Sequence, residues 1–132
     1  DMNSNQSNVE WPSELQIAPH VIMAYVDISS AGLRALMSLR TYFLDQSISS
    51  QSYFGNIVSS EHSVCAKAWK DCSRREDSAK PLEVFTVFNK DRAPVLSLLF
   101  VNAMLPVNII TGVAVDLIQG LMQRKVSRIS LV

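Results

Sequence analysis

Two cysteines and a histidine lie close together in the run SEHSVCAKAWKDC, and these residue types could form a disulfide or bind a metal. Cys65 and Cys72 are seven residues apart, and His62 precedes the first cysteine by three residues. If residues 60–75 form a helix, the two sulfur-bearing residues share a face but lie about 10.5 Å apart along the axis. A disulfide requires Cα atoms within about 7 Å, and one tetrahedral zinc ion with bonds of about 2.3 Å cannot take both thiolates.

A metal site that uses His62 together with Cys65 would need two further ligands, and His20 is the only other histidine in the chain. The simpler interpretation is an amphipathic helix, because unpaired cysteines are often buried like small apolar residues. The apolar face of that helix would consist of Cys65, Ala68, Trp69 and Cys72. We therefore expect neither a metal nor another cofactor.

The run DISSAGLRAL, residues 27–36, follows a predicted strand and opens a predicted helix, which is where α/β folds bind phosphate groups. It contains one glycine and neither a G-x-G-x-x-G nor a G-K-[ST] pattern, so it offers no backbone cradle for a nucleotide. Asp27 and the serines that follow more readily cap the helix. No G-x-S-x-G turn presents a nucleophile, and no pair of carboxylates stands out as an acid/base couple. The sequence thus indicates a protein that is not an enzyme.

Composition favours a small domain that binds other proteins. The 132 residues carry 12 basic and 12 acidic side chains, so the chain has no electrostatic footprint for nucleic acid. Hydrophobic residues make up 48% and charged residues only 18%, against about 25% in typical domains. With so few charges to cover its surface, the domain is expected to hide apolar area against a partner. Apolar runs are far shorter than the roughly 20 residues that span a membrane. Two cysteines and no secretion signal predict a cytoplasmic or nuclear protein.

The pattern along the chain predicts a single three-layer α/β domain, residues 14–132, after a flexible lead-in, residues 1–13. We expect a mixed sheet of about four strands with helices on both faces. The expected elements, in order, are a buried central strand at 21–28, a helix at 29–46, a serine-rich loop at 47–60, a helix at 60–75, a hairpin of strands 82–89 and 94–102, a helix at 107–124 and a strand at 126–132. The last helix would cross over right-handedly if the strands before and after it are parallel neighbours.

Two of the three predicted helices, the first and the last, have informative faces. In the first, only Arg40 interrupts the apolar face. The last helix has an unbroken stripe at helical spacing, made of Ile110, Val113, Ala114, Leu117 and Leu121. Gly112 and Gly120 lie eight residues apart in the same helix and could permit close packing there.

Two adjacent aromatic residues, Tyr53 and Phe54, lie in the serine-rich run SISSQSYFGNIVSS. A polar loop is a poor place to bury them, and aromatic residues are enriched in protein interfaces. We therefore expect Tyr53, Phe54 and Ile57 to contact a partner.

The run CAKAWKDC, residues 65–72, followed after a polar spacer by LEVFTVFN and PVLSLLFV, resembles the proteasome assembly chaperone 1 family of 20S proteasome assembly chaperones. The upstream strand VIMAYVDISSAG leading into a helix, and the terminal strand SRISLV, fit the same layout. The resemblance spans roughly residues 20–132, and CAKAWK is its most specific part.

This resemblance implies a non-enzymatic role. Members of the family pair with a second, related chaperone, and the heterodimer sits on the α-subunit ring of the 20S proteasome as it assembles. There it promotes correct ring formation and blocks premature dimerisation of half-proteasomes. The family can also dock a C-terminal tail of a hydrophobic residue, tyrosine and any residue. This chain ends in SRISLV without a tyrosine after Tyr53, so tail docking is not carried over to it.

Two other functions remain open from the sequence. A small nucleotide- or metabolite-binding α/β enzyme would use the end of the first strand, residues 27–30, and would show a deep polar pocket there. An adaptor domain of another complex would share every feature except CAKAWK and would differ in the identity of its partner.

Overall fold

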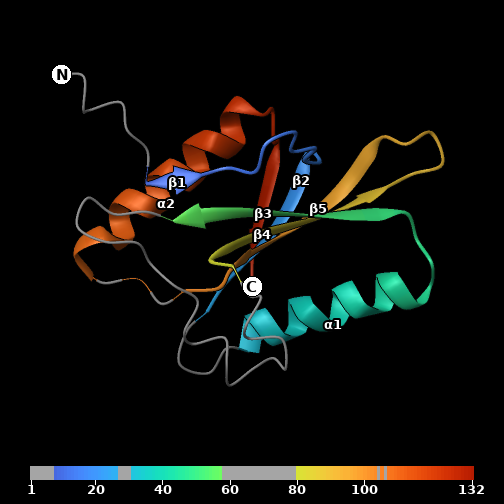
Figure 1. The fold of residues 1–132 in the computed structure, drawn as a ribbon, viewed down its shortest axis with the longest axis horizontal. Helices are drawn as coiled ribbons and strands as arrows, with labels where there is room; N and C mark the ends of the chain where they lie inside the picture. The colour runs from blue at the N-terminus through green and yellow to red at the C-terminus, as the bar shows by residue number, and fades with distance from the viewer. Residues whose placement is uncertain (1–7, 27–30, 58–79, 104, 106) are drawn as a thin grey trace.

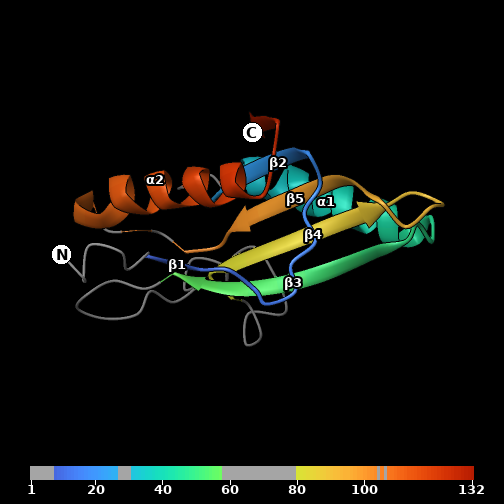
Figure 2. The same ribbon diagram turned by 90° about the horizontal axis from the view of Figure 1, so that it is seen from above.

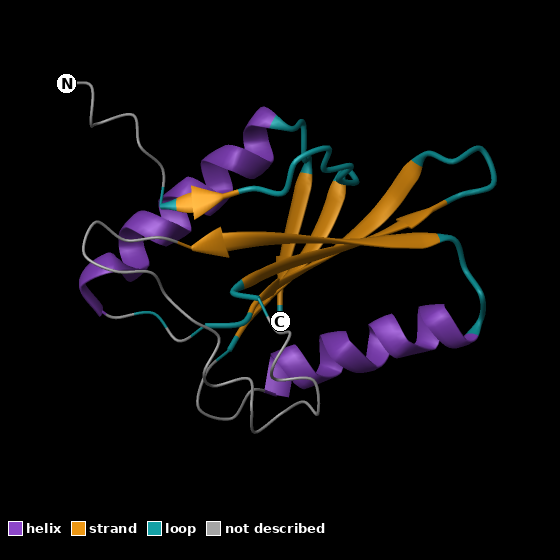
Figure 3. Cartoon of the chain, viewed as in Figure 1, coloured by secondary structure: helices purple, strands orange, loops and turns teal. Residues whose placement is uncertain are grey.

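The computed structural model describes residues 8–26, 31–57, 80–103, 105 and 107–132 (Figure 1). Six strands form one sheet in the order β1-β3-β4-β5-β2-β6. The strands are β1 (Val9–Glu10), β2 (His20–Tyr25), β3 (Ser50–Ile57), β4 (Leu82–Phe88), β5 (Pro94–Val101) and β6 (Arg128–Leu131), and the helices are α1 (Ala31–Asp45) and α2 (Val107–Gln123). The α/β class and the mixed sheet are confirmed (Figure 3). The sheet has six strands rather than about four.

The sheet is antiparallel on one side and parallel on the other. Strands β3, β4 and β5 pair antiparallel, and the predicted hairpin of β4 and β5 is confirmed. Strand β2 pairs parallel with both β5 and β6. It is therefore second from one edge, and the prediction of a central first strand is wrong. Strands β5 and β6, which α2 joins, are separated in the sheet by β2. The right-handed crossover was predicted only for neighbouring parallel strands, so that prediction does not apply to this pair.

One helix packs on each face of the sheet (Figures 1 and 2). Alternate residues of the central strands point to opposite faces, as the period of two requires. Phe85 and Leu98 join Leu33 and Leu36 of α1 in one core cluster. The other cluster joins the opposite strand positions to the buried stripe of α2, and its members include Val84, Leu99, Val113, Leu117 and Leu121. The described residues thus form three layers.

The N-terminal segment contributes to the second core cluster. Val9 is 4% exposed and pairs with Ile57 in an antiparallel bridge between β1 and β3. Farther along, the hydroxyl of Thr86 donates to the carbonyl of Gln16 at 2.8 Å, and the backbone N–H of Ala18 donates to Ser97 Oγ at 2.9 Å. These contacts hold the segment across the α2 face of the sheet. The predicted lead-in at residues 1–13 is therefore corrected from residue 8 onward.

The serine-rich run predicted as a loop contains strand β3. Its residues pair with β4 from Ser50 to Gly55, with Tyr53 opposite Val84. The predicted helix at residues 60–75, with its two cysteines, lies outside the described residues. The same holds for residues 27–30, which a nucleotide- or metabolite-binding enzyme would use.

Candidate protein-binding surface

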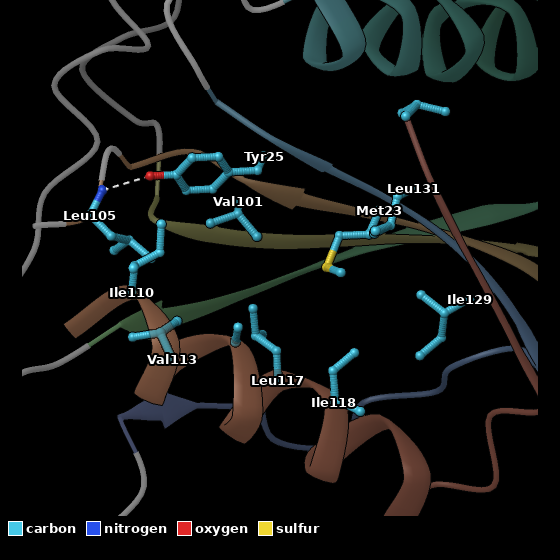
Figure 4. Close-up of a pocket in the computed structure, with 12 residues that line it drawn as sticks. Met23, Tyr25, Val101, Leu105, Ile110, Val113, Leu117, Ile118, Ile129 and Leu131 are labelled. Atoms are coloured by element: carbon cyan, nitrogen blue, oxygen red, sulfur yellow. Dashed lines mark hydrogen bonds between the residues drawn. The ribbon is translucent and has the colours of Figure 1, made fainter. Parts of the chain in front are cut away.

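An apolar cavity of about 610 Å³ opens between α2 and the adjacent face of β2, β5 and β6 (Figure 4). We call this cavity the apolar groove. Its walls come from Met23, Tyr25, Val101, Leu105, Ile110, Val113, Ala114, Leu117, Ile118, Ile129, Leu131 and Val132. The volume lies within the roughly 300–1,000 Å³ of typical ligand pockets. Such a space can accept bulky apolar groups.

The groove exists because α2 is fixed along its opposite side. The backbone N–H and the side-chain amide of Asn8 donate to the carboxylate of Asp116 at 2.8 and 3.1 Å. One turn later, Gly120 leaves room for the indole of Trp11, which the Arg124 guanidinium covers at 4.9 Å from the ring centroid. Close packing at Gly120 confirms the prediction for that glycine. These contacts hold α2 toward β1 and leave its other side open toward β6.

The groove contains one hydroxyl, that of Tyr25 in β2. Its oxygen accepts a hydrogen bond of 2.9 Å from the backbone N–H of Leu105 (Figure 4). The hydroxyl proton can still be donated, because a phenol both accepts and donates. The groove therefore offers an apolar surface with a single polar handle at one end.

The apolar surface continues from the groove onto the solvent side of α2. Val107 is 89% exposed, Met122 is 65% exposed, and Leu131 across the groove in β6 is 73% exposed. The only charged residue of α2 is Asp116, which the Asn8 hydrogen bonds hold on another side of the helix. An exposed helix side without charge is typical of a surface that meets another molecule.

Two of the three residues that we predicted for partner contact remain accessible. Phe54 is 50% exposed on the β3 side that faces away from α2, whereas Tyr53 is half-buried against the α2-side cluster. Burial raises the pKa of the Tyr53 hydroxyl, against a smaller opposing effect of a hydrogen bond with the Gln16 backbone. Ile57 is fully buried in the core, so its nomination as a contact residue is corrected. None of the three lines the apolar groove.

The sequence stripe of α2 could have found part of this surface. Of the five stripe residues, Val113, Leu117 and Leu121 are buried, while Ile110 and Ala114 remain exposed as walls of the groove. Periodicity alone cannot separate these two groups, because both lie on one helix face. The signal that the sequence analysis missed is the set of apolar residues of α2 outside that predicted stripe, such as Val107 and Met122, which indicate a second apolar side of the helix.

A buried ion pair lies on the other face of the sheet. The guanidinium of Arg40 in α1 contacts the carboxylate of Glu83 in β4, with side chains 7% and 9% exposed. The same guanidinium lies 4.8 Å from the centroid of the Phe100 ring. Arg40 is the one interruption of an apolar helix face, and its partner Glu83 is the one charged residue of β4. This pair closes the α1 face and is not accessible to a ligand.

Comparison of the chain with protein families, with curated proteins and with solved structures found no match. Within the described residues, no three histidine, cysteine, aspartate or glutamate side chains are grouped so that they could hold a metal ion. In that same part of the chain, neither helix has the length and apolarity to cross a membrane.

Proposed function

We propose that this chain is a non-enzymatic chaperone for assembly of the 20S proteasome α-ring, acting as a heterodimer with a second, related chaperone. The proposal that the α-ring is the target is supported by the sequence run CAKAWKDC and by the strand–helix–hairpin–helix–strand order around it. Protein binding is supported by one observation above all, the uncharged and exposed side of α2 beside the apolar groove. Such a chaperone would act in the cytoplasm and nucleus.

The mechanism that fits this surface is apolar and shape complementarity. An apolar side chain of the partner that enters the groove leaves water and contacts walls that are already apolar. Because the groove is built on β2, β5 and α2 rather than on a loop, its shape is largely set before binding, which lowers the cost of ordering. No cofactor is needed for this role.

The test is an affinity pull-down from a eukaryotic lysate with the tagged chain as bait and mass spectrometry of the bound proteins. We expect a second small α/β chaperone together with proteasome α-subunits. Ile118→Glu, which adds a charge to the groove wall, should reduce their recovery, whereas Leu44→Glu on the exposed side of α1 should not. A folded bait that recovers neither class of protein would contradict the proposal.

The aromatic residues of β3 are tested in the same experiment. Tyr53→Ser and Phe54→Ser should weaken partner binding if β3 also contributes to the interface. Unchanged recovery with intact folding would remove both residues from the interface and leave the α2 side as the proposed contact surface.

An adaptor role in another complex is the principal alternative, and the identity of the recovered partners decides between the two. A metabolite-binding role is less well supported within the described residues. A polar cavity of about 320 Å³ lies beside Glu14, Tyr53 and Arg92. Residues 27–30, the position that this role would use, lie outside the described residues. A thermal shift on addition of nucleotide would favour that role.

A further inference from the structure

Six of the exposed residues of α2 form a stripe whose positions are symmetric about a point near the middle of the helix. At 3.6 residues per turn, its members fall within roughly 100° of the helix circumference. They are Val107, Thr111, Ala114, Val115, Ile118 and Met122, and all six are exposed. The midpoint of this set lies between Ala114 and Val115. The six positions thus form three pairs, each with its two members equally far from that midpoint.

A second copy of the helix, turned by a twofold axis through that midpoint, matches this stripe. Val107 then lies opposite Met122, Thr111 opposite Ile118, and Ala114 opposite Val115. The two most exposed apolar residues of the helix, at 89% and 65%, cover each other. The small side chain of Ala114 lies at the centre, where two helices approach most closely. In a twofold interface each such pair occurs twice, once in each direction.

Charge also favours this arrangement. The exposed stripe contains no charged residue, and Asp116 is held on another side of the helix by Asn8. The basic residues Arg124 and Lys125 follow the end of α2. An antiparallel pair separates these residues of the two copies by roughly 30 Å at 1.5 Å per residue. That distance exceeds the screening length of about 8–10 Å, so these charges do not oppose an antiparallel pair.

The exposed apolar area of α2 and β6 is comparable with the apolar part of a standard protein contact. Burying one aliphatic side chain contributes about 1.5–3 kcal/mol. At about 25 cal/mol per Å², this energy corresponds to roughly 60–120 Å² of apolar surface for each side chain. The exposed apolar residues of α2 and β6 are Val107, Ile110, Val115, Ile118, Met122, Leu131 and Val132, with exposures of 36–89%. Together they offer roughly 250–500 Å² of apolar surface on one copy. A standard interface buries about 800 Å² per partner, of which somewhat more than half is apolar.

We propose that two copies of this chain associate through α2, as an antiparallel helix pair about a twofold axis between Ala114 and Val115. The apolar groove borders the stripe, so the same contact covers its rim. This homodimer goes beyond the proposed chaperone heterodimer. It uses the surface that a heterologous partner would occupy, so the two assemblies compete.

The oligomeric state tests the proposal. Analytical ultracentrifugation of the full chain over a wide concentration range should show a reversible monomer–dimer equilibrium. Val115→Glu brings two carboxylates together near the axis and should weaken the dimer at least tenfold, as should Thr111→Glu. Gln123→Glu adds the same charge to an exposed position outside the stripe and should leave the dissociation constant unchanged. All three positions are exposed, and circular dichroism checks the fold.

A charge pair tests the orientation. Val107→Lys and Met122→Glu should each weaken the dimer, and the chain with both substitutions should recover most of the lost affinity. In the antiparallel pair each lysine faces a glutamate of the other copy, whereas a parallel pair would set like charges together. A wild-type chain that stays monomeric at every concentration overturns the proposal, as does a dimer that resists both Val115→Glu and Thr111→Glu. Pull-down of proteasome subunits by a strictly monomeric chain would overturn the homodimer alone.

Discussion

The ion pair of Arg40 and Glu83 makes the sharpest prediction about stability. Both side chains are buried, between α1 and β4, and the guanidinium is further enclosed by the Phe100 ring. Replacing one partner leaves the other charge in an apolar environment without a counter-ion. We expect Arg40→Met and Glu83→Leu each to cost about 3–5 kcal/mol. That is a large part of the roughly 5–15 kcal/mol that stabilises a typical domain.

The double variant should behave differently. Arg40→Met with Glu83→Leu replaces both charges by apolar groups of similar length, so no uncompensated charge remains. Such replacements are neutral or stabilise by about 1–4 kcal/mol in other buried pairs. We therefore expect the double variant to be at least as stable as the wild-type chain. The losses of unfolding free energy in the two single variants will then not add up to the change in the double variant. Each single change leaves one buried charge without its partner, and the double variant has no such charge.

Urea unfolding followed by circular dichroism measures these differences. With a slope of about 1–3 kcal/mol per molar urea, a loss of 3 kcal/mol lowers the midpoint by about 1–3 M. Arg34→Met, at an exposed position of the same helix, is the matched control and should change the midpoint little. If the double variant is the least stable of the set, with a loss close to the sum of the single losses, the reasoning is refuted.

Two further predictions concern the α2 face. Gly120→Ala places a methyl group against the indole of Trp11 and should destabilise by about 1–3 kcal/mol in urea unfolding, even though alanine favours helices. Gly112→Ala is its control, since the new methyl group meets only the side-chain amide of Asn8, at 3.2 Å, and should cost less than Gly120→Ala; equal losses would contradict this. Burial raises the pKa of Tyr53 above 10.0, so its contribution to stability is complete below pH 10 and is lost as the pH rises through the folded-state value. Tyrosinate absorbance should show a late-titrating group that Tyr53→Phe removes, together with a smaller alkaline loss of stability; an unchanged titration curve would count against this assignment.

The elements with strong local signals were predictable from sequence. The hairpin of β4 and β5 has two apolar runs on either side of a polar turn. Asn89 closes this turn through its side chain, which accepts from the backbone N–H groups of Asp91 and Ala93 at 2.9 and 3.0 Å. Helix α2 has apolar residues at regular helical spacing, and its buried side is the predicted one. In both cases local propensity and tertiary packing favour the same structure.

Strands β1 and β3 were not predictable in the same way. A two-residue strand such as β1 has no periodicity, and its pairing depends on Ile57, far along the chain. The serines of β3 have no strong strand preference, and most of its residues are at least partly exposed. What makes β3 a strand is its partner β4, whose backbone groups need pairing, and strand propensity depends strongly on such context. The position of β2 beside β6 likewise depends on long-range pairing rather than on its own apolar run.

The two helices complete their faces of the sheet in different ways, and the difference locates the binding surface. Helix α1 packs through Leu33 and Leu36 and through a charged side chain, Arg40, that already has its partner. Helix α2 has two apolar sides. One is the buried stripe on its own sheet, and the other is the exposed stripe from Val107 to Met122. A helix that is apolar on more than its core-facing side is typical of one that is buried on both sides. Within the described residues nothing covers the second side, and another protein that supplied this cover would account for the low charge of the chain.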